Sequence, residues 1–115
     1  MNMFTRIIIS TISIMVVGYV LPGVEVSSVY TAFIVAIILA LLNTIVKPIL
    51  IILTLPVTIV TLGLFLLIIN GFIVLIANHF IEGFSVSSLF IAIIFSILVS
   101  LINGLLGINS LNEKK

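Results

Sequence analysis

Residues 23–43 read GVEVSSVYTAFIVAIILALLN, and residues 83–103 read GFSVSSLFIAIIFSILVSLIN. Shifting the chain by 60 residues superimposes the two stretches without a gap, and 9 of the 21 positions are identical. The matches include Gly, Ser and Asn, which a background rich in Ile would not supply. The apolar run before each stretch aligns as well. The sequence therefore predicts a two-helix hairpin that is present twice.

Charged residues are scarce along the whole chain. Of its 115 residues, 63% are hydrophobic and 6% are charged, whereas about a quarter of an average soluble domain is charged. Such a sequence has too little polar surface to cover a water-soluble globule. This excludes a soluble enzyme and a nucleic-acid-binding protein. The chain has no Cys and one His, and no catalytic set, phosphate-binding loop or metal motif is present. We expect an integral membrane protein that is not an enzyme and uses no cofactor.

The charges divide the chain into apolar stretches whose lengths predict the membrane spans. A helix needs about 20 apolar residues to cross the hydrocarbon core of a bilayer. The fold class is therefore an all-α integral membrane protein with four transmembrane helices, forming a single membrane domain over residues 1–115. The four spans cover roughly residues 7–21, 29–46, 62–81 and 88–106. The repeats cover about 7–47 and 62–107, and a polar tail covers 108–115.

Residues 48–61, between the two repeats, read PILIILTLPVTIVT. This length suits a re-entrant or interfacial segment better than a crossing. Pro48 opens the segment, and Pro56 removes a backbone donor and would kink or break a helix that runs through it. We expect a Pro-broken re-entrant or interfacial segment here, with part of a kinked helix as the alternative.

The Lys and Arg residues predict the orientation, because cytoplasmic loops carry an excess of both. Arg6, Lys47 and the pair Lys114–Lys115 are the topology anchors, and four crossings place all of them in the cytoplasm. Glu25 and Glu82 then lie together outside. Both hairpins run from inside to outside and back, so the repeat is a parallel one with its axis along the membrane normal. Both termini are cytoplasmic.

Small side chains recur every four residues in the second and fourth spans, and we call these series the small-residue ridges. In lipid, close backbone approach through small residues drives helices together. We expect the ridges to be helix-packing surfaces that face each other or a second subunit of a homo-oligomer. Their first members also stand where a helix N-cap is wanted. The ridges are Ser28, Ala32, Ala36, Ala40 and Thr44, and Ser88, Ala92, Ser96, Ser100 and Gly104.

Three asparagines are the intramembrane polar residues of the predicted spans. Asn43 and Asn103 are repeat equivalents near the cytoplasmic ends of their spans, and Asn70 lies well inside the third span. An unpaired amide at that depth is costly. Each asparagine therefore either forms a hydrogen bond between helices or lines a polar path, and we favour the hydrogen bond.

The remaining polar residues carry weaker signals. His79 lies three residues before Glu82, which makes the two neighbours on a helix. A pH-responsive pair or half of a metal site would have this spacing, but we favour interfacial polar residues. Glu25 and Glu82 are not repeat equivalents, so we expect solvated loop residues and not an acid–base pair. Lys47 could also bind anionic head groups.

Several short motifs between residues 21 and 107 match a known family. They are LPG at 21–23, LNTIVKPIL at 42–50, LTLP at 53–56, TLGLF at 61–65, IN at 69–70 and EGF at 82–84. With these motifs the chain resembles the phage holin family 4 superfamily, the group that contains YvlD-type bacterial membrane proteins. The resemblance implies a small multispan protein of the bacterial cytoplasmic (inner) membrane. The holin label implies membrane permeabilisation during phage lysis.

Three functions remain open from the sequence. The preferred one is a holin-like protein that oligomerises and alters membrane permeability. The second is a non-enzymatic structural or regulatory envelope protein that binds a membrane-protein partner through residues 47–63. The third is a small transporter, although no intramembrane charge marks a coupling-ion site. In each case the lipid bilayer is a partner and nucleic acid is not.

Overall fold

The computed structural model describes residues 2–107. The predicted tail over 108–115, with Lys114 and Lys115, lies outside these residues. Along the chain the elements are α1 (Met3–Val20), β1 (Val24–Val26), α2 (Val29–Leu53), α3 (Leu55–Val60), α4 (Phe65–Phe80), β2 (Phe84–Val86) and α5 (Leu89–Leu105).

Four apolar helices make up most of the described part of the chain. α1 and α2, with 18 and 25 residues, are long and apolar enough to cross a membrane. α4 and α5 are shorter apolar helices of 16 and 17 residues, which rise about 25 Å at 1.5 Å per residue. Each of these helices overlaps one predicted span. The mostly helical fold predicted from the sequence is therefore observed.

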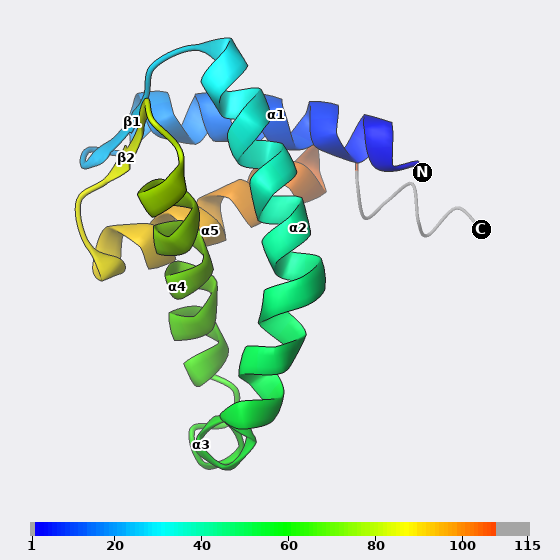
Figure 1. The fold of residues 1–115 in the computed structure, drawn as a ribbon, viewed down its shortest axis with the longest axis vertical. Coiled ribbons are helices and arrows are strands. Elements are labelled where there is room, and N and C mark those ends of the chain that lie inside the picture. The colour runs from blue at the N-terminus through cyan, green and yellow to red at the C-terminus, as the bar shows by residue number, and fades with distance from the viewer. Residues whose placement is uncertain (1, 108–115) are drawn as a thin grey trace.

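The helices form two arms that diverge from one corner of the molecule (Figure 1). α1 packs beside α5 in one arm, and α2 packs beside α4 in the other. Contacts of α1 with α2 and of α4 with α5 join the arms near that corner. α3 connects α2 to α4 at the far end of the second arm.

The two interhelical turns have the same local structure. Each begins with a glycine in the left-handed region, Gly23 at φ 94° and Gly83 at φ 89°, where a side chain would be strained. A short strand follows, and then a serine N-cap. The Ser28 hydroxyl oxygen accepts a hydrogen bond from the backbone N–H of Thr31 at 3.1 Å, and Ser88 accepts one from Ile91 at 3.2 Å. The N-cap prediction is confirmed.

The all-α prediction needs one correction, because the two turns pair as an antiparallel sheet. The register aligns Val24 with Val86, Glu25 with Ser85 and Val26 with Phe84. Ser27 N–H donates to the Gly83 carbonyl and Ser87 N–H to the Gly23 carbonyl, both at 2.8 Å. We call this element, residues 23–27 with 83–87, the β-clasp. Strands of three residues give almost no periodic signal, which is why the sequence did not reveal them.

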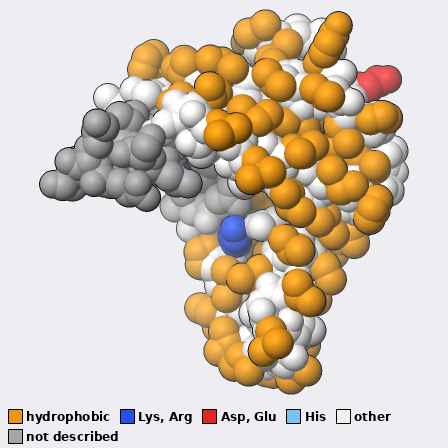
Figure 2. Space-filling model, turned by 180° about the vertical axis from the view of Figure 1, so that it is seen from behind, with side chains coloured by type: hydrophobic (Ala, Val, Ile, Leu, Met, Phe, Trp, Pro, Cys, Tyr) orange, Lys and Arg blue, Asp and Glu red, His pale blue; other side chains and the backbone are white. Residues whose placement is uncertain are grey.

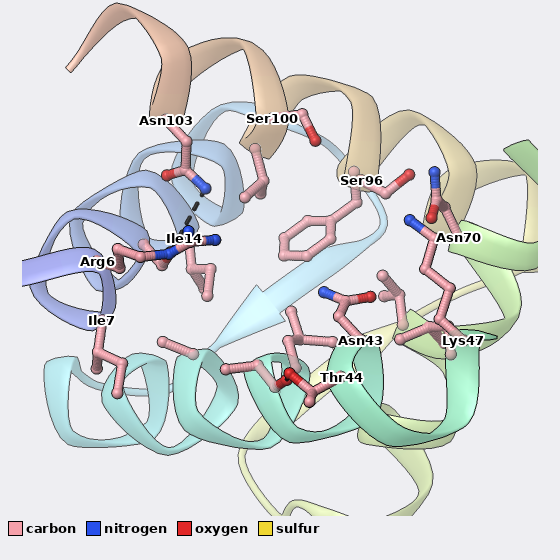
Figure 3. Close-up of a pocket in the computed structure, with 18 of the residues that line it drawn as sticks. Arg6, Ile7, Ile14, Asn43, Thr44, Lys47, Asn70, Ser96, Ser100 and Asn103 are labelled. Carbon is pink, nitrogen blue, oxygen red and sulfur yellow. Dashed lines mark hydrogen bonds between the residues drawn. The ribbon is translucent and has the colours of Figure 1, made fainter. Parts of the chain in front are cut away.

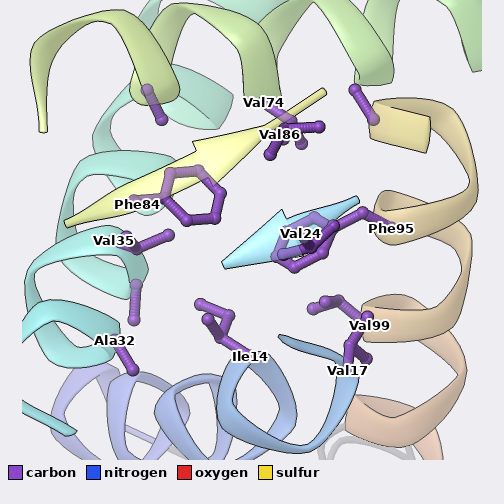
Figure 4. Packing of buried hydrophobic residues seen from close by; sticks show 13 residues of the cluster. Ile14, Val17, Val24, Ala32, Val35, Val74, Phe84, Val86, Phe95 and Val99 are labelled. Atoms are coloured by element: carbon purple, nitrogen blue, oxygen red, sulfur yellow. The ribbon is translucent and has the colours of Figure 1, made fainter. Parts of the chain in front are cut away.

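The hydrophobic core lies directly beneath the β-clasp (Figure 4). Side chains from all four long helices meet there with the inward residues of both strands. Phe84 of the clasp packs against Phe95, with ring centroids 5.6 Å apart. The core residues that are at most 3% exposed include Ile14, Val17, Ala32, Val35, Val74, Phe84, Ala92 and Phe95. The core therefore closes the molecule at the clasp end and leaves the other end of the arms apart.

The proline-containing segment differs from the expected boundaries. α2 continues through Pro48 and ends at Leu53 instead of near Val46. The helix is interrupted at Thr54 (φ −108°, ψ 17°). Pro56 lies in the first turn of α3, where a backbone N–H would have no hydrogen-bond partner within the helix. Residues 48–61 are therefore shared between the end of α2 and α3. A re-entrant or interfacial position for α3 stays a prediction.

Candidate functional site

A cavity of about 510 Å³ lies between the two arms. Its inner wall is apolar and belongs to the core, where Ile14 from α1, Ile73 from α4 and Phe95 from α5 are buried. Met3 and Arg6 line it near the N-terminus of α1, and Gly104 lines it near the end of α5. The cavity is thus closed by the core on the clasp side and open where the arms diverge.

Both small-residue ridges face this cavity over most of their length. Ala36, Ala40 and Thr44 line it from α2, and Ser96, Ser100 and Gly104 line it from α5. The preceding members, Ala32 and Ala92, are completely buried in the core. The ridges thus turn toward a shared space in the described chain. Their contribution to assembly stays a prediction.

The two equivalent asparagines have different surroundings. Asn103 connects α5 to α1, since its Oδ1 accepts a hydrogen bond from the Ser13 hydroxyl at 2.5 Å and its Nδ2 donates to the Ser10 hydroxyl at 3.4 Å. Asn43 points into the cavity (Figure 3), is exposed, and forms no side-chain hydrogen bond within residues 2–107. Asn70 also lines the cavity and is half-buried. Thus one asparagine joins helices and two face the cavity.

Two basic side chains reach into the cavity from opposite walls (Figure 3). Arg6 enters from α1 and Lys47 from α2. Neither side chain forms an ion pair or a hydrogen bond within residues 2–107, and no acidic residue lines the cavity. A basic side chain is visible in a hollow surrounded by hydrophobic side chains (Figure 2). Arg6 and Lys47, which the sequence predicts to be topology anchors, therefore both line one positively charged cavity.

The other polar residues are at the clasp end. Glu25 lies in β1, and Glu82 directly precedes Gly83 of the β-clasp; both are exposed. His79 is exposed too, and its ring stacks edge-on against Phe80 with centroids 5.1 Å apart. Among residues 2–107, no three His, Cys, Asp or Glu side chains are grouped so that they could hold a metal ion.

Sequence reasoning missed two serines and one asparagine that hold the structure together. Ser10 and Ser13 are the α1 partners of Asn103, and Ser13 is fully buried. Their spacing of three residues within an apolar run would have placed them on one helix face. Asn78 Oδ1 accepts a hydrogen bond from the Val86 N–H at 3.3 Å and so fixes β2 to α4.

Comparison with protein families identifies the chain. A family model described as mycobacterial 4 TMS phage holin, superfamily IV, matches residues 1–105. The chain belongs to this holin family. The resemblance noted from the sequence is confirmed, and the four transmembrane segments in the family description agree with four apolar helices here. Neither a curated protein nor a solved structure matches the chain. As a superfamily IV holin, it is a small membrane protein whose helices lie in a lipid bilayer.

Proposed function

We propose that this holin-family protein oligomerises in the bacterial cytoplasmic membrane and alters its permeability, without enzymatic activity. The supporting observation is the distribution of polar side chains. Hydroxyl, amide and basic groups from four helices converge on one cavity, whereas the outer faces of the helices are apolar (Figure 2). Helices that surround a membrane pore need a polar face toward water and an apolar face toward lipid.

The charge distribution supports an orientation with both termini in the cytoplasm. Arg6 and Lys47 line the open cavity, and Glu25 and Glu82 lie at the clasp end. By the positive-inside rule, the cavity then opens toward the cytoplasm and the β-clasp lies outside. α3 joins the antiparallel helices α2 and α4 and does not need to cross, which agrees with four spans.

The register of the β-clasp supports a parallel duplication of a two-helix hairpin. A shift of 60 residues converts the pair Val24–Val86 into the pair Phe84–Val26, which is also present. It likewise converts the hydrogen bond from Ser27 to Gly83 into the bond from Ser87 to Gly23. Equivalent residues of the two hairpins thus make equivalent contacts.

The closed inner wall of the cavity leaves no path across a single chain in this conformation. Ile14, Ile73 and Phe95 are at most 1% exposed, so the cavity of a single chain ends at the core. A continuous path would form when several chains bring their cavity surfaces together or when the hairpin α1–α2 separates from the hairpin α4–α5. The same closed wall favours the second candidate, a structural or regulatory membrane protein that leaves the membrane sealed.

Controlled expression in a bacterium separates the two candidates. The assay follows entry of a membrane-impermeant dye and loss of membrane potential as the amount of protein in the membrane rises. We expect abrupt permeabilisation above a threshold. The double variant Ala40→Leu with Ser100→Leu, which replaces small cavity-lining residues by large apolar ones, is expected to stay sealed.

A matched control introduces leucine on the outer faces of the same two helices. Ile45→Leu with Ile97→Leu changes residues that are 59% and 37% exposed, so permeabilisation should be unchanged. Dye-tight cells that contain abundant wild-type protein in the membrane would refute the permeability proposal and favour the second candidate.

A further inference from the structure

We infer that the cavity between the arms binds the phosphate-bearing head group of an anionic lipid, with Arg6 and Lys47 supplying the positive charge from two walls of the cavity. This inference does not depend on the permeability proposal, because a sealed membrane protein could bind the same lipid. The site combines unpaired positive charge, free hydrogen-bond donors and apolar lining residues.

The lining of the cavity is positively charged. Arg6 and Lys47 bring two positive charges into one lining, and no carboxylate lies in it. Two like charges in one cavity disfavour each other unless an opposite charge lies nearby. The nearest candidates for pairing within residues 2–107, Glu25 and Glu82, lie at the clasp end. An anion from outside the described chain would neutralise the site.

The cavity also contains several hydrogen-bond donors. The guanidinium group of Arg6 presents a planar fork that matches phosphate oxygens, and the Lys47 ammonium supplies a point charge. Asn43 directs its amide into the same space (Figure 3), and Ser100 adds a hydroxyl that has no hydrogen bond within the described residues. A phosphodiester has two non-bridging oxygens that accept such bonds.

Apolar side chains in the cavity lining favour a lipid over free phosphate. Met3, beside Arg6 in the cavity lining, is 57% exposed. Ile7 and Leu39 are half-buried apolar residues of the same lining. A lipid with its head group in the cavity can lay its acyl chains on these surfaces, whereas an inorganic ion gains nothing from them. The volume of about 510 Å³ also exceeds what one phosphate needs.

Native mass spectrometry of the purified full-length protein in detergent tests the inference. The probes are phosphatidylglycerol, phosphatidylcholine with the same acyl chains, and inorganic phosphate. We expect preferential binding of phosphatidylglycerol. Arg6→Gln and Lys47→Gln should each weaken it about fivefold, the effect of removing roughly one kcal/mol of attraction to an anionic lipid. Phosphatidylcholine binding should not change.

Two further variants serve as controls. Arg6→Lys keeps the charge and should retain most of the binding, which separates loss of charge from loss of folding. Lys115→Gln removes one positive charge from the tail and should bind phosphatidylglycerol like the wild type. Equal binding of the two lipids, wild-type binding by both Gln variants, or an equal loss with Lys115→Gln would overturn the inference. Free phosphate that binds as tightly as the lipid would overturn the choice of a lipid.

Discussion

Replacing Asn103 by Ala removes the side chain that joins α5 to α1, and its effect can be worked out from the structure. The variant loses a hydrogen bond of 2.5 Å to Ser13 and one of 3.4 Å to Ser10. Hydrogen bonds between membrane helices contribute about 0.6 kcal/mol on average and at most about 1.7 kcal/mol. The Ser13 hydroxyl can then donate its one proton to the Ile9 carbonyl at 3.1 Å, so the buried hydroxyl is not left unpaired. We expect a loss of about 1–2 kcal/mol in unfolding free energy.

Asn43→Ala is the matched control, because Asn43 is the equivalent residue of the other hairpin and makes no side-chain hydrogen bond within residues 2–107. We expect a change within about 0.5 kcal/mol, as for most exposed positions. The assay is unfolding of the purified protein in mixed micelles by increasing SDS, followed by far-ultraviolet circular dichroism. Equal destabilisation by the two variants, or no effect of Asn103→Ala, would refute the assignment of Asn103 as an interhelical link.

Two other predictions concern the turns and the β-clasp. Gly83→Ala should cost about 2–3 kcal/mol, because it forces a side chain to a positive φ and pushes its Cβ against the Ser27 hydroxyl. Gly63→Ala has the same backbone strain but nothing within 4 Å of the new Cβ, so it should cost about 1 kcal/mol; the same SDS titration measures both, and equal losses would contradict the predicted clash. Glu25→Cys with Ser85→Cys places two thiols on paired residues of an otherwise cysteine-free chain. If the two hairpins, α1–α2 and α4–α5, separate to permeabilise the membrane, the resulting disulfide should block dye entry until a reductant is added; unchanged entry by the oxidised variant would exclude separation at the clasp.

The helices and the positions of the small residues could be predicted from the sequence because both depend on local periodicity. Uncharged runs between Arg6, Lys47 and Glu82 located the four spans. The repeat interval of 60 residues identified Ser28 and Ser88 as equivalent helix N-caps from the sequence alone. Both patterns depend on residues that are close in the sequence, so they can be recognised without knowing how the helices pack.

Features that depend on contacts between distant segments could not be predicted in the same way. The strands Val24–Val26 and Phe84–Val86 are too short to form alone, and each extended conformation is stabilised by the other. The sequence predicted an interruption of the helix near Pro48, yet α2 continues through this residue. Proline removes one backbone hydrogen bond, and the other hydrogen bonds of this 25-residue helix remain. The position of Lys47 was predicted, but its direction into the cavity depends on how α2 turns against α4.

The short link at α3 has a kinetic consequence for how the molecule assembles. As part of one chain, the two hairpins meet at an effective concentration in the millimolar range, which no ordinary level of expression reaches for separate molecules. Completion of the four-helix unit is therefore a first-order event whose rate is independent of the number of chains in the membrane. Association between units has no such tether, so its rate rises steeply with the number of chains per membrane area. A cell could thus accumulate folded units for a long time before encounters between them become frequent.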